Sequence, residues 1–191
     1  MKIGLFFGSF NPVHVGHMII ANHLAEYSDL DQVWMVVSPH NPLKNKSSLA
    51  RDRDRFHLVQ LAIGDHSKIK ASNVEFSLPL PSYTIDTLAF LHEKYPNKTF
   101  ALIMGGDSLA GIDKWKNYET LLSNYDIYLY KRAGVDISPF EKGSRIIIVE
   151  SPLLNISATF IRDSIKKGKS IRYLVPDAVF EYLEGSKMYK K

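Results

Sequence analysis

The sequence contains no cysteine among its 191 residues. This absence excludes disulfide bonds, thiolate metal sites and cysteine nucleophiles, and it suits a reducing cytoplasm. No apolar run approaches the length that spans a bilayer. The first residues also lack the long apolar core and small-residue cleavage site of a signal peptide. We therefore expect a cytoplasmic protein that has no membrane partner.

The sequence also has little excess of charge of either sign. Lysine and arginine total 24 against 20 acidic residues, which gives a net charge of +4. Such a balance suits a polyanionic ligand, for example a nucleotide or another phosphorylated molecule. Aromatic and basic residues do not interleave along any one element, so no nucleic-acid partner is expected. There is no internal repeat, and the length suffices for a single domain over residues 1–191 with its own core.

Strand and helix patterns alternate along the whole chain. Short apolar runs predict strands, and segments with helical spacing predict helices between them. The strands are expected at residues 3–7, 32–38, 69–76, 99–104, 126–130 and 146–149, and the helices at 18–27, 52–63, around 85–91 and in a C-terminal helical part over about 157–191. This order predicts an α/β fold, with a Rossmann-like, doubly wound, mainly parallel sheet, helices on both faces and a small C-terminal helical segment.

The same patterns predict where individual side chains lie. Tyr27 should share the packing face of the first helix with Leu24. Arg55 stands beside the apolar stripe of the second helix, where a surface position is open to it. Glu75 should point outward from the third strand. The charged end of the chain, residues 188–191, should be frayed.

A glycine turn joins the first predicted strand to the first helix. It reads Gly8-Ser9-Phe10-Asn11-Pro12-Val13-His14-Val15-Gly16-His17. A glycine-bearing turn that enters a helix offers backbone N–H groups and the positive end of the helix dipole, and both favour a bound phosphate. His14 and His17 are three residues apart, so both can face the same side. One histidine alone would more often be a cap or a core residue, but the pair favours phosphate chemistry.

This turn resembles the HxGH signature of the nucleotidylyltransferase superfamily. That superfamily usually opens with Gly-Gly-Thr-Phe-Asp-Pro, where this chain has Phe7-Gly8-Ser9-Phe10-Asn11-Pro12. Asn11 keeps a turn-forming side chain and lacks the charge of the usual aspartate. The resemblance implies an ATP site that places His17 nearest the α-phosphate and is formed by Gly8, Ser9, Phe10, His14 and His17.

A second hydroxyl-rich helix start occurs at Ile156-Ser157-Ala158-Thr159-Phe160-Ile161-Arg162. Ser157 is a good helix N-cap. Hydroxyl and N–H groups at a helix N-terminus, together with an arginine, also make a phosphate cradle. The stretch resembles the superfamily's Ile-Ser-Ser-Thr-x-Ile-Arg. The resemblance assigns Ser157, Thr159 and Arg162 to the β- and γ-phosphates of ATP, and it makes His14, His17 and Arg162 the expected catalytic residues.

A third motif resembles the nicotinate-nucleotide branch of these adenylyltransferases. It reads Ser82-Tyr83-Thr84-Ile85-Asp86-Thr87-Leu88. Either Ser82 or Thr84 is expected to cap the helix. The resemblance implies that the backbone around Thr84 receives the nicotinate carboxylate, since a helix start suits an anion.

Two further stretches resemble the same branch. Gly105-Gly106-Asp107-Ser108-Leu109 follows a strand, and Trp115 comes shortly after it. Asp107 reads equally well as a helix cap or as a residue that faces a ribose or base, and the resemblance implies that Trp115 lies against the nicotinate ring. Lys44 ends a rearranged form of the branch's Pro-Pro-His-Lys, so we expect it to contact phosphate in the substrate-binding site.

These motifs, spread over nearly the whole chain, identify it as a member of the bacterial nicotinate-nucleotide adenylyltransferases. The resemblance implies an enzyme of NAD biosynthesis, a nucleotidyltransferase that joins ATP and nicotinate mononucleotide into deamido-NAD and pyrophosphate. Mg²⁺ is the expected cofactor and would enter with ATP, because no carboxylate cluster for a dedicated metal site is visible. Nicotinamide mononucleotide and phosphopantetheine remain alternative acceptors, and a non-catalytic nucleotide sensor is the alternative from another class. The oligomeric state is left open, a homo-oligomer included.

Overall fold

The computed structural model describes residues 1–39, 49–130, 145–152 and 154–190. Its strands are β1 (Lys2–Gly8), β2 (Gln32–Val37), β3 (Ile69–Ser72), β4 (Thr99–Gly105), β5 (Ile127–Tyr130) and β6 (Ile146–Val149). Its α-helices are α1 (Val15–Tyr27), α2 (Asp52–Ile63), α3 (Thr84–Lys94), α4 (Gly106–Ala110), α5 (Tyr118–Asn124), α6 (Ala158–Lys166) and α7 (Asp177–Gly185). Two 3₁₀ turns, η2 (Val74–Ser77) and η3 (Ile112–Lys114), complete the described elements.

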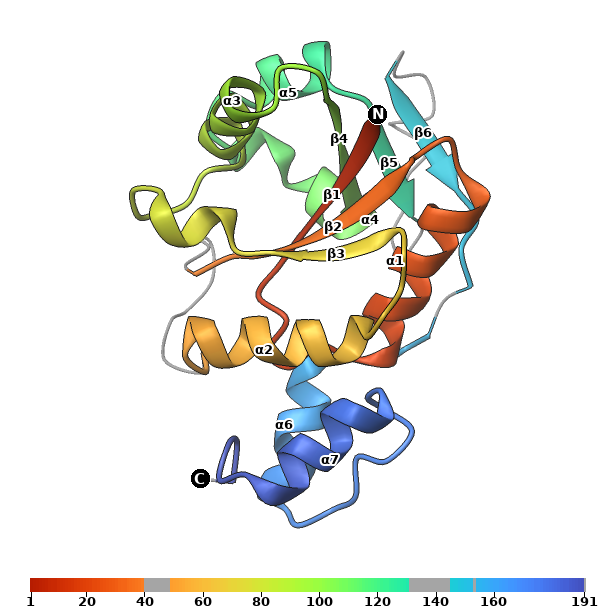
Figure 1. Ribbon diagram of the computed structural model, residues 1–191, viewed down its shortest axis with the longest axis vertical. Coiled ribbons are helices and arrows are strands. Elements are labelled where there is room, and N and C mark those ends of the chain that lie inside the picture. Colours follow the sequence, from red (N-terminus) through yellow and green to blue (C-terminus); the bar gives the residue numbers. More distant parts are fainter. Residues whose placement is uncertain (40–48, 131–144, 153, 191) are drawn as a thin grey trace.

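The six strands form one parallel sheet in the order β3-β2-β1-β4-β5-β6. The order reverses direction at β1, which lies between β2 and β4 (Figure 1). A reversal of this kind leaves a crevice at the carboxyl ends of the central strands, where doubly wound folds bind ligands. The predicted Rossmann-like parallel sheet is therefore confirmed.

Hydrophobic cores lie on both faces of the sheet. Leu24 of α1 and Leu58 of α2 belong to one core, and Leu88 of α3 and Leu121 of α5 belong to the other. Figure 1 shows α1 and α2 on one face of the sheet and α3 and α5 on the opposite face. Strands covered on both sides read as continuous apolar runs, which is why β1 and β4 could be located from the sequence.

The C-terminal helices α6 and α7 lie beyond the edge of α2, at the lower end of the molecule in Figure 1. Val179 and Leu183 of α7 are buried and join the core that contains α2. The backbone N–H of Val15 donates to the carbonyl of Leu174 at 3.0 Å. The start of α1 is therefore fastened to the C-terminal segment.

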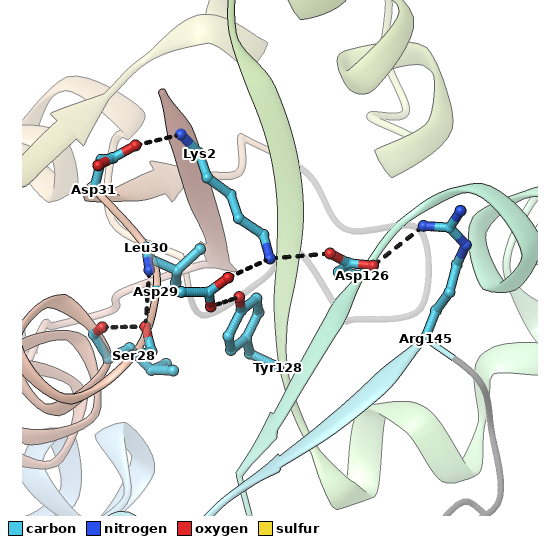
Figure 2. Close-up of polar contacts among 9 residues, drawn as sticks. Lys2, Ser28, Asp29, Leu30, Asp31, Asp126, Tyr128 and Arg145 are labelled. Carbon is cyan, nitrogen blue, oxygen red and sulfur yellow. Dashed lines mark hydrogen bonds and ion pairs between the residues drawn. The ribbon is translucent and has the colours of Figure 1, made fainter.

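A charge network ties the amino ends of two strands together (Figure 2). Lys2 Nζ contacts Asp29 at 2.9 Å and Asp126 at 3.0 Å. The Tyr128 hydroxyl donates to Asp29, and Arg145 contacts Asp126 at 3.1 Å. These contacts lie at the end of the sheet opposite the strand carboxyl ends, so the network stabilises the fold away from the crevice.

This network shifts the pKa of its members in opposite directions. The hydrogen bond from Tyr128 and the ammonium of Lys2 hold the pKa of Asp29 below its ordinary value. Burial, with the bond to Asp29, raises the pKa of Tyr128 to about 12. The network therefore favours an ionised Asp29 beside a protonated Tyr128.

Two side-chain expectations, those for Tyr27 and Glu75, were wrong. Tyr27 is 76% exposed, because Ala21, Leu24 and Ala25 form the buried stripe of α1 instead. Glu75 does not point outward from a strand, because the chain leaves the sheet after Ser72 and turns into η2, where Glu75 is only 2% exposed.

Arg55 and the chain end also differ from expectation. Arg55 is fully buried, with 0% of its surface exposed. At the C-terminus, Tyr189 packs against the hydrophobic core and its hydroxyl donates to Asn11 Oδ1 at 2.7 Å. The described residues of the tail are thus fastened to the core rather than frayed. None of the described helices combines the length and the apolar character that crossing a membrane requires.

Candidate active site

The turn after β1 is shaped by a buried phenylalanine. A Cβ at Gly8 would lie 2.7 Å from the ring of Phe10, so only glycine leaves room for that ring. Phe10 is 1% exposed and adopts a positive φ of 42°, a left-handed conformation that costs a non-glycine residue about 1–2 kcal/mol. Its ring makes edge contacts with Phe6 and His17, at centroid distances of 5.7 and 5.0 Å. This packing holds the strained backbone in place.

The two histidines of the turn are stacked. His14 directly precedes α1, and His17 lies in its first turn. Their ring centroids are 3.6 Å apart with an interplanar angle of 24°. The backbone N–H of His14 donates to His17 Nδ1 at 3.3 Å, so a neutral His17 ring carries its proton on Nε2. The prediction that both rings face the same side is confirmed.

Asn11 connects this turn to two distant parts of the chain. Its Oδ1 accepts the backbone N–H of Ala50 at 3.0 Å and the hydroxyl of Tyr189 at 2.7 Å. Asn11 is 2% exposed. A neutral amide oxygen can accept these two donors without the cost of a buried charge, which is a physical reason for asparagine at this position.

The second phosphate signature lies against the first. Ser157 caps α6 as predicted, since its Oγ accepts the N–H of Phe160 at 3.2 Å. Arg162 donates to the carbonyl of Asn11 at 2.8 Å and to Thr159 Oγ1 at 3.2 Å. The guanidinium of Arg162 therefore joins the start of α6 to the turn before α1, although 151 positions separate Arg162 from Asn11.

The residues with the nicotinate-type motifs lie near each other on neighbouring elements. Thr84 is the first residue of α3, and Tyr83 precedes it at the cap position. No side-chain cap bond is made there, so the expectation that Ser82 or Thr84 caps the helix was wrong. Lys116 Nζ contacts both carboxylate oxygens of Asp86, at 2.9 and 3.0 Å, and thereby holds the segment after Trp115 against the first turn of α3.

Trp115 lines a small hollow at the carboxyl ends of β1 and β4. The other lining residues are Phe6, Phe7, Leu102, Ile103, Met104, Gly105, Ser108 and Tyr130. Phe6 also contacts the ring of His17, with centroids 6.1 Å apart. The hollow beside Trp115 and the histidine pair therefore meet at Phe6.

Side chains approach the Gly105 backbone closely where the hollow borders α4. A Cβ at Gly105 would lie 2.7 Å from Asp107 Oδ1 and 3.0 Å from the Tyr130 ring. Asp107 is exposed in the first turn of α4, and the helix has no side-chain cap bond. Of the predicted substrate residues, Lys44 lies outside the described part of the chain.

Three further residues at the site were missed by the motifs. Arg55 donates to Ser9, in the turn at residues 8–14 that we call the phosphate turn after its predicted ligand. Glu75 accepts from Thr87 of α3 at 2.8 Å, and Tyr189 donates to Asn11. Burial raises the pKa of Glu75, and hydrogen bonds from the Ser38 and Thr87 side chains offset only part of that rise. Burial also raises the pKa of Tyr189, against the opposing charges of Arg55 and Arg162.

For Arg55 a sequence signal existed. It lies three and four positions before Leu58 and Val59, on the buried stripe of α2, where an arginine is out of place unless it is paired.

Comparison with known proteins assigns this arrangement to a family. The model of the cytidylyltransferase-like family matches residues 5–164, which include both phosphate signatures. The chain belongs to the cytidylyltransferase-like family. Among curated members it is 55% identical to a "Probable nicotinate-nucleotide adenylyltransferase" of Flavobacterium johnsoniae, over 100% of both chains. It is 43% identical to a protein of the same name from Bacteroides fragilis, over 94% of this chain and 90% of that one.

A solved member of the same fold is structurally similar. The nicotinic acid mononucleotide adenylyltransferase of Plasmodium falciparum, solved in complex with NaAD, superposes with a TM-score of 0.84. The alignment covers 98% of this chain and 97% of that chain at 21% identity. At this identity the likeness establishes the shared fold of the family and leaves individual residue roles to be argued from the site itself.

Proposed function

We propose that this protein transfers the adenylyl group of ATP to nicotinate mononucleotide and releases pyrophosphate, as a step of NAD biosynthesis. The observation that carries the proposal is the bond from Arg162 to Asn11, which brings the second phosphate signature onto the turn of the stacked histidines. Full-length relatives that carry the name nicotinate-nucleotide adenylyltransferase support the choice of acceptor. We treat residues 1–191 as one functional unit, because Val15 and Asn11 fasten the sheet to the C-terminal helices.

The reaction needs no protein nucleophile. A phosphate oxygen of the mononucleotide attacks the α-phosphorus of ATP, a new P–O bond forms, and the bond from the α-phosphorus to the bridging oxygen breaks. The electron pair of that bond leaves with pyrophosphate. Catalysis then consists of alignment and of stabilising negative charge on the transferred and departing phosphates.

The residue roles follow from this requirement. His17 donates from Nε2 to the α-phosphate, because its Nδ1 already accepts the N–H of His14. Gly8, Ser9 and Phe10 face the phosphates with their backbone, and the start of α6 with Ser157, Thr159 and Arg162 holds the β- and γ-phosphates. Asp107 faces the ribose or base.

ATP enters as its Mg²⁺ complex. Within the described ranges, no three histidine, aspartate or glutamate side chains gather in a group that could hold a metal ion. Mg²⁺ would therefore arrive as part of the substrate, held mainly by phosphate oxygens and water, and would neutralise charge on the phosphates.

The acceptor fits between Trp115 and the start of α3. Thr84 offers the first N–H groups of that helix to the nicotinate carboxylate, and Trp115 packs against the ring. The contact of Lys116 with Asp86 holds the two together. Nicotinamide mononucleotide lacks the negative charge of the carboxylate and gains less from the helix start, so the acid form is the preferred acceptor.

The test is pyrophosphate release from MgATP with nicotinate mononucleotide, nicotinamide mononucleotide and phosphopantetheine supplied separately. Release with nicotinate mononucleotide, and at least about tenfold less with the other two, is expected. A His17→Ala variant should lose about 100-fold or more in kcat, since one donor to the developing charge is removed. His23→Ala, on the same helix but stacked on Tyr27, is the matched control. If none of the three acceptors supports pyrophosphate release, the proposal is overturned in favour of a nucleotide sensor.

A further inference from the structure

Arg55 is a charged side chain in the interior of the protein. It extends from α2 and is the largest of the fully buried side chains. Its ion-pair partner is Asp52, at 2.8 Å, whose own side chain is 46% exposed. A buried guanidinium is stable only when its N–H groups are paired, so its partners indicate what it does.

The guanidinium of Arg55 donates to four backbone carbonyls around the candidate site and to the Asp52 carboxylate. Nε donates to Ala50 O at 3.1 Å, and Nη1 donates to the carbonyls of Ser9 and Ser38, the latter at 3.0 Å. Nη2 reaches Pro39 O at 3.5 Å as well as Asp52. An arginine side chain has five N–H groups, and these five contacts account for them all. Arg55 therefore acts on a ligand only through the segments it holds.

The contact with Ser9 sets the direction of one peptide group. In a planar trans peptide the C=O and the following N–H point in opposite directions. Because the Ser9 carbonyl faces the Arg55 guanidinium, the N–H of Phe10 faces away from it. Phe10 is also the residue with the strained φ of 42°, and a charge-assisted hydrogen bond offsets that strain.

Through its contact with Ser38, Arg55 also holds the backbone at the end of the next strand, β2. The N–H of Ser38 donates to Gly8 O at 2.9 Å, so the ends of β1 and β2 are joined directly as well as through Arg55. Arg55 and the Ser38 backbone thus join the turn after β1 to the end of β2.

We propose that Arg55 is a positioning residue for adenylyl transfer, which holds the Ser9–Phe10 peptide with its N–H toward the ATP phosphates. The inference rests on the proposed function for its chemistry, but its geometry also predicts the binding of MgATP.

Arg55→Lys tests this role, because it keeps the charge and loses the planar fork that reaches Ala50, Ser9 and Ser38 together. We expect kcat to fall about 100-fold, the loss that misplacement of reacting groups produces. The KM for nicotinate mononucleotide should change less than threefold. The affinity for MgATP, measured by calorimetry without acceptor, should fall about tenfold. Arg53→Lys, an exposed residue of the same helix, is the control and should match the wild type.

Chemical rescue separates positioning from support of the fold. Arg55→Ala with ethylguanidinium in the buffer should recover at least about tenfold of the lost kcat, whereas ethylammonium should recover none. Measurements are made below the unfolding temperature of each variant. An Arg55→Lys enzyme that keeps its kcat and its MgATP affinity within twofold overturns the proposal, as does equal rescue by both additives. If the wild type binds MgATP but adenylates no acceptor, the proposed function fails, and the Arg55 proposal is still decided by MgATP affinity.

Discussion

Individual residues in this protein gain their roles from what buries them. Glu75 is the clearest case. It is only 2% exposed, although glutamate side chains are rarely buried in protein interiors. Hydroxyl groups from Ser38 and Thr87 reach it, yet desolvation prevails and the pKa of Glu75 stays above its ordinary value. The protonated form is therefore favoured by folding.

Glu75→Gln should remove a pH dependence of stability. The unfolded-state pKa of Glu75 is near 4.5, and the folded-state pKa lies above it. The contribution of Glu75 to stability is therefore complete below about pH 4.5 and is lost as pH rises through the folded-state pKa. The variant keeps an amide that accepts from Thr87 and has no carboxylate to ionise. Its free energy of unfolding relative to wild type should therefore rise with pH above about 4.5 and become constant once the pH exceeds the folded-state pKa of Glu75, as measured by urea denaturation at a series of pH values.

Glu93→Gln, an exposed carboxyl on α3, is the matched control and should show no such trend. Parallel pH curves for Glu75→Gln and wild type would contradict the expected ionisation behaviour of Glu75.

At the scale of elements, the candidate site and the charge network lie at opposite ends of the strands. The carboxyl ends of β1, β2 and β4 carry the phosphate turn, Ser38 and the Gly105 hollow. The amino ends of β1 and β5 carry the network of Lys2, Asp29 and Tyr128 (Figure 2). Because a parallel sheet sends all its carboxyl ends to one edge, stability contacts at the other edge leave the ligand crevice unobstructed.

Asp29→Asn should therefore cost stability without affecting catalysis. The pKa of Asp29 is lowered in the folded protein, so its contribution is present above about pH 3.8 and is lost as pH falls through the folded pKa. The Asp29 side chain is 67% exposed, so we expect a loss of about 1 kcal/mol at pH 7 that shrinks in acid, with kcat unchanged. Denaturation curves at pH 7 and at a pH below about 3.8 measure the loss of stability. The exposed Asp65→Asn variant is the control. A reduced kcat in the folded variant would contradict the separation of the two ends.

At the scale of the whole molecule, contacts join the turn after β1 to the C-terminal segment. Tyr189, in the C-terminal tail, donates to Asn11, and Arg162 of α6 donates to the carbonyl of the same residue. Asn11, in the turn after β1, is therefore the residue through which the C-terminal segment contacts that turn. A change in the tail should reach the phosphate site through Asn11.

Tyr189→Phe should raise the KM for ATP. The variant keeps the ring in the core and loses only the hydroxyl that donates to Asn11 at 2.7 Å. One such bond is worth about 1 kcal/mol, so stability should fall by about that amount and the KM for ATP should rise at most about fivefold. Steady-state kinetics with ATP as the varied substrate measure this. Tyr173→Phe, at a position 79% exposed, should leave both quantities unchanged. An unaltered KM for ATP in Tyr189→Phe would mean that the tail serves stability alone.

Much of the fold could be predicted because it depends on residues close together in the chain. The apolar runs of β1, β2 and β4, the histidine pair of the turn and the Ser157 cap are all local patterns. Periodicity, capping and the dipole of a helix start act over a few residues, so the sequence contains them directly. Helix bounds were accurate for α2 and late by three residues for α1, since the phosphate turn itself enters that helix at Val15.

The rest was decided only by the tertiary structure. Glu75 appears in the sequence as a charged residue of an ordinary surface segment, and Tyr189 as part of a charged tail. The position of Arg55 on the apolar stripe of α2 indicates burial, but it does not identify the partners. The partners of Arg55, Glu75 and Tyr189 are 46, 12 and 178 positions away, in Ser9, Thr87 and Asn11. A buried polar group is stable only where distant backbone and side chains supply its hydrogen bonds. The sequence by itself determined the elements, their order and the phosphate motifs, whereas long-range packing decided which charged side chains hold those motifs in position.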